Sequence, residues 1–269
     1  MECENHMTND FLPINENDMR RRGWDRLDFI LVTGDAYVDH PSFGSAIISR
    51  LLESRGFRVG VIARPDWTSA ASFRVLGEPR LAFLVTAGNI DSMVSNYTAA
   101  KKKRTDDVYA PGRRGAGRPD RAVVSYSIRI REAYGRVPIV LGGLEASLRR
   151  LSHYDYWQNK VRRSVLIDAG ADLLVYGMGE HQILQIAERL AHGASIGDCT
   201  DIRGTVYQTR DHNAARDSVP LPPFEETAAD PKRFAESFFI QYQNSDPFTA
   251  RTLAEPYPDR LVLQNPPAR

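Results

Sequence analysis

Three side chains that could transfer protons or hold a ligand follow one apolar segment near the start of the chain. An apolar, partly β-branched run within residues 28–33 predicts a buried strand, which breaks at Gly34. Asp35, Asp39 and His40 lie in the loop that follows. Such groups could act as general acid and base, or bind a hydroxylated or cationic substrate. The alternative is that the carboxylates cap the loop and His40 is a surface residue, and spacing alone does not decide between the two.

Three further apolar runs, at residues 81–86, 137–141 and 171–176, also end in loops with glycines and polar residues. In open parallel sheets, ligands bind beyond the carboxyl ends of the strands, where the strand order reverses. We therefore expect the loops to converge on one rim. The candidate ligand-binding residues there are Asp35, Asp39, His40, Gly44, Gly88, Asn89, Asp91, Gly142, Gly143, Glu145, Arg149, Gly177, Gly179 and Glu180.

The elements that must position these residues alternate along the chain. Another strand is predicted at residues 57–63, and helical spacing between strands is clearest at residues 42–55 and 180–190. The pattern predicts an α/β, Rossmann-like domain at residues 28–195, with a parallel five-stranded sheet, helices on both faces and flavodoxin-like strand order. Residues 1–27 are expected to be a leader, and residues 196–269 an irregular C-terminal extension.

The glycines and aromatic residues in these loops also have ordinary structural explanations. Gly142-Gly143 and Gly177-x-Gly179 complete neither a dinucleotide-binding fingerprint nor a P-loop, and such glycines often serve only to make tight turns. The run from His153 to Trp157 could line a pocket for a flat ligand, with His153 and Tyr156 as candidate contacts. Aromatic runs are more often involved in packing, so packing is the favoured interpretation.

Residues 97–121 are rich in lysine, arginine, glycine and proline, and predict a mobile basic loop. Such a loop could bind RNA or a phosphate-bearing substrate. It has no regularly interleaved aromatic residues and no RNA-binding signature, which favours a solvated loop.

The composition bears on the cellular compartment and on possible metal sites, but it does not indicate which reaction the protein could catalyse. The 269 residues carry a formal net charge of +1, which argues neither for nor against a polyanionic partner. The chain has 2 cysteines, Cys3 and Cys199, which indicates a reducing compartment and is too few for an all-cysteine zinc site or a thiolate-held cluster. No signal peptide and no membrane-spanning run is evident. We therefore expect a cytoplasmic protein with no membrane partner and no metal site.

The ordered set of motifs resembles the N-terminal region of the YgiQ-type radical SAM proteins, over about residues 11–267. The matching segments are residues 11–14, 19–24, 33–44, 87–93, 142–150, 153–157 and 176–180. The resemblance implies a cobalamin-binding-like α/β domain followed by a radical SAM barrel. In that barrel, Cys-x-x-x-Cys-x-x-Cys holds a [4Fe-4S] cluster, and S-adenosylmethionine is cleaved to a 5′-deoxyadenosyl radical.

This chain lacks the three-cysteine motif, so the resemblance assigns it no cluster ligand, and Cys3 and Cys199 match no part of the motif. It is expected to be an N-terminal piece that is inactive alone. Its role would be to shape or bind substrate for a barrel located in cis in full-length relatives. The alternatives are a stand-alone ligand- or RNA-binding module without catalysis, or a hydrolase using Asp35, Asp39 and His40.

Overall fold

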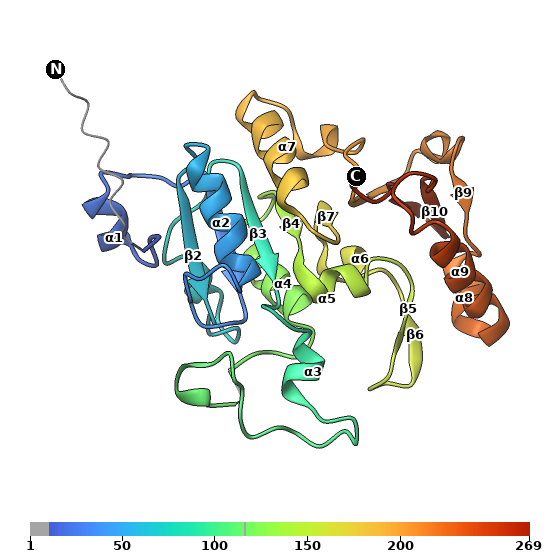
Figure 1. Cartoon of the computed structure of the whole chain (residues 1–269), viewed down its shortest axis with the longest axis horizontal. Helices are drawn as coiled ribbons and strands as arrows, with labels where there is room; N and C mark the ends of the chain where they lie inside the picture. The colour runs from blue at the N-terminus through green and yellow to red at the C-terminus, as the bar shows by residue number, and fades with distance from the viewer. Residues whose placement is uncertain (1–10, 116) are drawn as a thin grey trace.

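The computed structural model describes residues 11–115 and 117–269 and is built around one large sheet (Figure 1). Cys3 and the first ten residues of the predicted leader lie outside the described residues. Within the described ranges, nine strands form this sheet in the order β2-β1-β3-β4-β7-β8-β11-β10-β9. The strands of the sheet are β1 (Phe29–Thr33), β2 (Val59–Ala63), β3 (Ala82–Thr86), β4 (Ile139–Leu141), β7 (Leu173–Val175), β8 (Thr205–Thr209), β9 (Val219–Pro220), β10 (Leu253–Tyr257) and β11 (Arg260–Gln264).

A separate hairpin and the helices complete the fold. The hairpin consists of β5 (His153–Asp155) and β6 (Lys160–Arg162), which pair in antiparallel fashion. The α-helices are α1 (Glu16–Arg21), α2 (Gly44–Ser54), α3 (Ser92–Asn96), α4 (Ala122–Tyr134), α5 (Gly143–Leu148), α6 (Val165–Ala169), α7 (Glu180–Ala191), α8 (Phe224–Ala229) and α9 (Pro231–Gln243). The short 3-10 helices are η1 (Ala70–Phe73), η2 (Pro111–Arg113), η3 (Ile196–Asp198) and η4 (His212–Ala215).

The first five strands of the sheet order are parallel, as the apolar runs predict. β1 pairs with β2 on one side and with β3 on the other, so the strands that follow β2 are added on the opposite side of β1 and the strand order reverses there. β4 and β7 then extend the sheet beyond β3. All five residues of β1 are buried, which is expected of a central strand covered on both faces.

Helices cover both faces of this parallel half, and strand alternation divides the core between them. Phe29 and Leu31 of β1 pack in a cluster with residues of α2 and α7, whereas Ile30 and Val32 pack with residues of α4 and α6. Successive side chains of a strand point to opposite faces, so one continuous apolar strand serves both cores. The apolar spacing of α7 follows from helical geometry instead, since its buried positions, such as Ile183 and Leu190, lie on the one helix face that packs on the sheet.

Two parts of the sequence-based prediction are wrong. The sheet has nine strands in the described residues rather than five, and residues 196–269 are not irregular. β8 pairs with β7 and β11 in antiparallel fashion, β10 pairs with β11, and short β9 forms the edge. Buried polar residues conceal these strands in the sequence. Glu255 of β10 is fully buried and accepts hydrogen bonds from Ser152 N (3.1 Å to Oε1) and the Tyr257 hydroxyl (2.7 Å to Oε2).

No helix in the described part of the chain is long and apolar enough to cross a bilayer.

The continuous sheet predicts that the C-terminal strands unfold together with the parallel half. Replacing the fully buried Leu263 of β11 by alanine should lower the free energy of unfolding by about 2–5 kcal/mol, because it leaves a cavity beside the sheet. Urea denaturation followed by circular dichroism should show one transition at a lower midpoint. Leu148→Ala, at an exposed position, is the matched control and should change the free energy by less than about 0.5 kcal/mol. A second, separate transition in the Leu263 variant would contradict the single cooperative unit.

Candidate functional site

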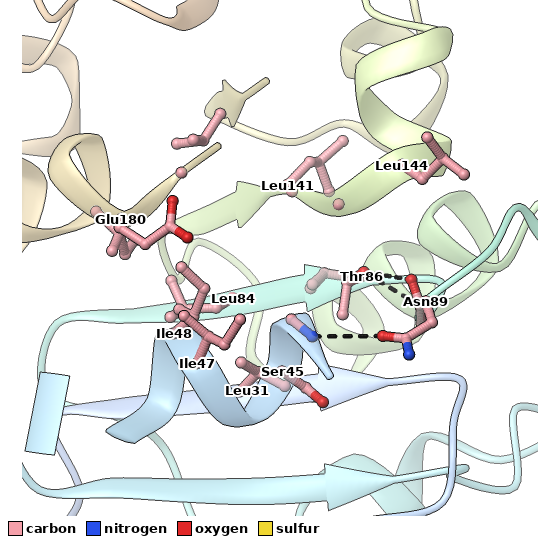
Figure 2. Close-up of a pocket in the computed structure, with 18 of the residues that line it drawn as sticks. Leu31, Ser45, Ile47, Ile48, Leu84, Thr86, Asn89, Leu141, Leu144 and Glu180 are labelled. Carbon is pink, nitrogen blue, oxygen red and sulfur yellow. Dashed lines mark hydrogen bonds between the residues drawn. The ribbon is translucent and has the colours of Figure 1, made fainter. Parts of the chain in front are cut away.

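A pocket of about 450 Å³ lies at the carboxyl ends of β1, β3, β4 and β7, beside the point where the strand order reverses (Figure 2). This is the rim to which the sequence assigns the candidate ligand-binding residues. The volume is typical of a pocket for a small organic molecule. The predicted residues that line it are Gly44, Gly88, Asn89, Gly142, Gly143, Gly177, Gly179 and Glu180.

Most of the pocket wall is apolar. Ile47 and Ile48 of α2, Leu84 of β3 and Leu144 at the start of α5 line it (Figure 2), together with Val140 of β4. These side chains come from four different elements, so the wall exists only once the sheet has formed. An apolar wall of this kind provides affinity by removing ligand surface from water, whereas orientation must come from the few polar groups.

The polar groups of the pocket gather at two opposite places. The Asn89 side chain accepts a hydrogen bond from Gly44 N (3.3 Å) and donates one to Ser42 O (3.2 Å), which ties the loop after β3 to the start of α2. Figure 2 shows Glu180 across the cavity from Asn89. Glu180 is the lining residue with a formal charge within the described part of the chain, and no lysine or arginine from those residues lines the pocket.

Two of the longer helices begin at this pocket, and neither is capped by the side chain of its own N-cap residue. The N-cap of α2 is Phe43 and that of α7 is Gly179. Asn89 Oδ1 already accepts from Gly44 N, the first N–H of α2. The first backbone N–H groups of a helix have no intrahelical acceptor and carry the positive end of the helix dipole. The pocket therefore combines backbone donors with a single carboxylate.

Two of the predicted glycines are required by close packing. Gly88 has a φ of +112°, and a Cβ there would lie 2.1 Å from Asp35 Oδ1. Gly143 has a φ of +82°, and its Cβ would lie 2.4 Å from Thr86 Oγ1. Both positions would strain any other residue, which agrees with the tight-turn interpretation of these glycines.

Asp35 lies beneath the rim and does not line the pocket. Its carboxylate accepts hydrogen bonds from Asn89 N (2.7 Å) and from Arg118 Nη2 (2.7 Å), and both charged side chains are excluded from solvent. Arg118 also lies 3.3 Å from Asp107, which pairs with Arg64 at 2.8 Å. Burial raises the pKa of Asp35, and the Arg118 charge opposes that shift. The carboxylate thus holds the backbone of Asn89 at the rim.

Asp39 and His40 also lie outside the pocket wall. Asp39 pairs with Arg50 of α2, whose Nε lies 2.9 Å from Asp39 Oδ2. His40 is exposed, and its Nδ1 accepts a hydrogen bond from Ser42 N at 3.2 Å. Asp35, Asp39 and His40 therefore have separate hydrogen-bond partners, and no hydrogen bond joins any two of them in the described structure.

Glu145, Asp91 and Arg149 form a buried network behind the pocket. Asp91 caps α3 by accepting from Met93 N (2.8 Å), and Arg149 lies 2.6 Å from its carboxylate. Glu145 accepts from Ser92 N (2.8 Å) and from Val123 N (3.1 Å), at the start of α4. Burial raises the pKa of Glu145, opposed by the Arg149 charge. These contacts join α3, α4 and α5.

The two aromatic candidates lie away from the pocket as well. His153 is partly buried in β5, and burial lowers the pKa of its imidazole to about 4, so it is neutral at pH 7. Tyr156 is 58% exposed at the turn of the β5–β6 hairpin. Neither belongs to the pocket lining.

The described residues do not fit an iron–sulfur cluster. No group of three or more histidine, cysteine or acidic side chains lies close enough in residues 11–115 and 117–269 to hold a metal ion. Cys199 is fully buried, and burial raises the pKa of its thiol, which disfavours the thiolate form that ligates iron. A cluster of the radical SAM type needs three such ligands, so no chemical step is assigned to a cluster in this chain.

The comparison with known proteins decides the family. The family model described as Radical SAM N-terminal matches residues 11–269. This chain belongs to that family. The resemblance to YgiQ-type proteins is confirmed by relatives called UPF0313 proteins. They include one from Clostridium botulinum strain 657 with 53% identity over 258 residues and one from Methanocella arvoryzae with 54% over 255. A third, from Geobacter sulfurreducens, is 52% identical over 259 residues.

These family members are much longer than the chain. The matches cover 95 to 96% of this chain but 40 to 43% of each of the three relatives. No solved structure matches the chain. The strand order and the pocket therefore come from the structure of this family member itself.

Sequence reasoning missed several residues of the pocket. Ser45 and Thr86 line it, and both lie at the end of an element the sequence predicts, so a search of strand ends and helix starts for hydroxyl groups could have found them. Tyr109 also lines the pocket, although it belongs to the basic loop. Its carbonyl oxygen accepts from Ala36 N at 2.8 Å, which brings the middle of the loop to the rim. No local pattern signals that contact.

The buried Asp35–Arg118 pair predicts a pH-dependent loss of stability. Arg118→Met removes the cation and leaves a buried carboxylate, which should cost about 3–5 kcal/mol near pH 7. Asp35 already has a raised pKa in the folded state, and loss of Arg118 raises it further. Stability must then fall as the pH rises from the ordinary carboxyl range toward that raised pKa, because the carboxyl ionises first in the unfolded state. Urea denaturation at about pH 4 and about pH 7 should show the larger loss at the higher pH.

The double variant Asp35→Asn, Arg118→Met is the matched control. Because it removes the ionising group, its loss of stability relative to the unchanged chain should vary less with pH than that of Arg118→Met alone. An equal loss at both pH values in the single variant would contradict the assignment of Asp35 as the uncompensated charge.

Proposed function

We propose that this chain serves as the substrate-binding N-terminal domain of a radical SAM protein, with part of the substrate held in the pocket at the strand ends. The observation that carries the proposal is the pocket itself. This chain belongs to the Radical SAM N-terminal family, and its pocket lies where the strand order reverses. In this proposal, Asp35 and Glu145 maintain the shape of the site, and the pocket residues contact the ligand.

The flavodoxin-like, cobalamin-binding-like assignment belongs to the same proposal. It is supported by the order β2-β1-β3-β4-β7 of the parallel strands, which corresponds to 2-1-3-4-5 in chain order. In domains with this order, a ligand lies across the ends of the first and third strands, here β1 and β3. The pocket extends further, over β4 and β7, and leaves room for a ligand longer than one ring system.

The catalytic part is proposed to lie in the remainder of the longer family members. Their length leaves more than half of each polypeptide for a barrel that would hold the [4Fe-4S] cluster and S-adenosylmethionine. We propose that residues 196–269 lead toward it. Helix α9 supports this, because Phe238, Phe239 and Tyr242 are 63, 57 and 70% exposed on its solvent side. Exposed aromatic stripes of this kind are typical of interfaces.

The charge of the pocket indicates the kind of group it would take. Glu180 lies at the cavity, and no lysine or arginine of the described chain lines it, so an anionic group would gain only the helix N-termini. A neutral or cationic group with an apolar body would bury its surface against the isoleucine and leucine side chains. We therefore propose a substrate whose bound portion is uncharged or positively charged.

Three small probes of similar size test the proposed charge preference. Benzylamine, benzyl alcohol and benzoate share a ring and differ in charge, and their binding can be followed by ligand-observed NMR titration. We expect benzylamine to bind about fivefold more tightly than benzyl alcohol, from about 1 kcal/mol of attraction to Glu180, and benzoate to bind least. Glu180→Gln should abolish the difference between the amine and the alcohol.

Glu188→Gln provides the control on the same helix, since Glu188 is exposed and lies outside the pocket lining. This variant should retain the preference of the unchanged chain. Tightest binding of benzoate, or absence of binding by all three probes, would contradict the proposed substrate class.

If this domain serves a barrel, 5′-deoxyadenosine formation should require the full length of the relatives and should not be seen with residues 1–269 alone.

A further inference from the structure

Two segments far apart in the sequence, the loop after α3 and the end of the β5–β6 hairpin, lie side by side below the sheet in Figure 1. Residues 97–104, at the start of the basic loop, contact the turn of the β5–β6 hairpin. The Tyr156 hydroxyl donates to Ala99 O at 2.8 Å, and Lys101 Nζ donates to Trp157 O at 3.1 Å. We call the surface formed by residues 97–104 and 154–160 the basic-aromatic surface.

The hairpin supplies the aromatic side chains that the basic loop lacks in sequence. The rings of Tyr97 and Trp157 lie 4.1 Å apart at 33°, and Lys101 Nζ lies 4.9 Å from the centre of the Tyr156 ring. Tyr154 and Tyr156 are 48% and 58% exposed. Exposed aromatic rings beside lysines are the combination that binds unpaired bases and their phosphates.

The lysines of this surface have no ion-pair partner among the described residues. Lys101, Lys102, Lys103 and Lys160 are exposed, and none forms an ion pair with a carboxylate of the described residues. Asp155, in the hairpin, pairs with Arg121. Asp120 keeps its charge beside the surface, where it accepts from the Tyr97 hydroxyl (2.8 Å) and from Asn96 Nδ2 (2.9 Å). An anionic ligand would therefore meet four unpaired lysines with Asp120 nearby.

The backbone holds these lysines in a defined turn. Thr98 N donates to Lys102 O (2.8 Å), Lys101 N donates to Thr98 O (2.9 Å), and Tyr97 bridges to Lys103. Arg104 Nε donates to Val94 O and Tyr97 O, both at 3.2 Å, which fixes the turn against α3. A preformed arrangement lowers the entropy cost of binding.

We propose that the basic-aromatic surface binds single-stranded nucleic acid, with the lysines contacting phosphates and Tyr154 and Tyr156 stacking on unpaired bases. Bases in a duplex are already stacked on one another, so the exposed tyrosines would add nothing to duplex binding. The surface is separate from the pocket, and the inference does not depend on the substrate proposed for it.

Fluorescence anisotropy with labelled oligonucleotides of about 12 nucleotides tests the proposal. The whole chain is titrated with oligouridylate RNA, oligothymidylate DNA and a mixed-sequence duplex at about 50 to 200 mM salt. We expect the single strands to bind more tightly than the duplex, with affinity that falls as salt rises. The RNA and DNA arms show which sugar is preferred. Equal or tighter binding of the duplex, or no binding of single strands, overturns the proposal.

Substitutions separate stacking from charge and from anchoring of the hairpin. Tyr156→Ala should weaken single-strand binding about tenfold, whereas Tyr156→Phe keeps the ring and should stay within about twofold. The pair Lys102→Ala, Lys103→Ala should lower the slope of log affinity against log salt by about 1 to 2. An equal loss for Tyr156→Phe and Tyr156→Ala would overturn stacking and indicate that the bond to Ala99 carries the effect.

Matched controls are Phe248 and Lys232, which are exposed outside the basic-aromatic surface. Phe248→Ala and Lys232→Ala should leave both the affinity and the salt slope unchanged. If they weaken binding as much as the variants at Tyr156 and Lys102, the binding is not localised to this surface and the proposal fails.

Discussion

The buried pair of Asp35 and Arg118 is the contact on which the rim of the pocket depends. Arg118 returns from the end of the basic loop to meet Asp35, and it also donates to the carbonyl oxygen of Ala87 at the end of β3. A guanidinium excluded from solvent is costly unless its charge is matched. Asp35 and Asp107 match the charge of Arg118, although its Nε finds no hydrogen-bond partner in the described structure, and Asp35 in turn holds Asn89 N. The Arg118 side chain thus joins the loop after β1, the loop after β3 and the basic loop, which are far apart in the sequence.

Much of the parallel half could be predicted from the sequence, because each of its strands is marked by residues within the strand itself and at its ends. Strands such as β1 are continuous apolar runs buried on both faces, and glycines mark their ends. The convergence of four loops at one edge then follows from parallel pairing alone. β10 could not be recognised in this way, because it contains Glu255 and Pro256 and its buried carboxylate is satisfied by Ser152, which lies 103 residues away.

The candidate site shows the same division between local and distant information. Gly143 and Glu180 line the pocket where the strand-end argument places them, whereas Asp35 turns away because Arg118, 83 residues later, provides a buried partner. A carboxylate at a strand end has the same local sequence whether it faces a ligand or an arginine beneath the rim. Only the tertiary contact distinguishes the two, so residue type and spacing alone cannot say which acidic residues line the pocket.

The basic loop is part of the site rather than an appendage to it. Its first residues form the basic-aromatic surface, Tyr109 lines the pocket and Arg118 supports the rim. The middle of the loop is fixed to the rest, since Tyr109 N donates to Asp107 Oδ1 at 3.0 Å and Asp107 pairs with Arg64 near β2. The loop is therefore held at its start by the hairpin, in its middle by Asp107 and at its end by Arg118, so its course is fixed by the elements that surround the pocket.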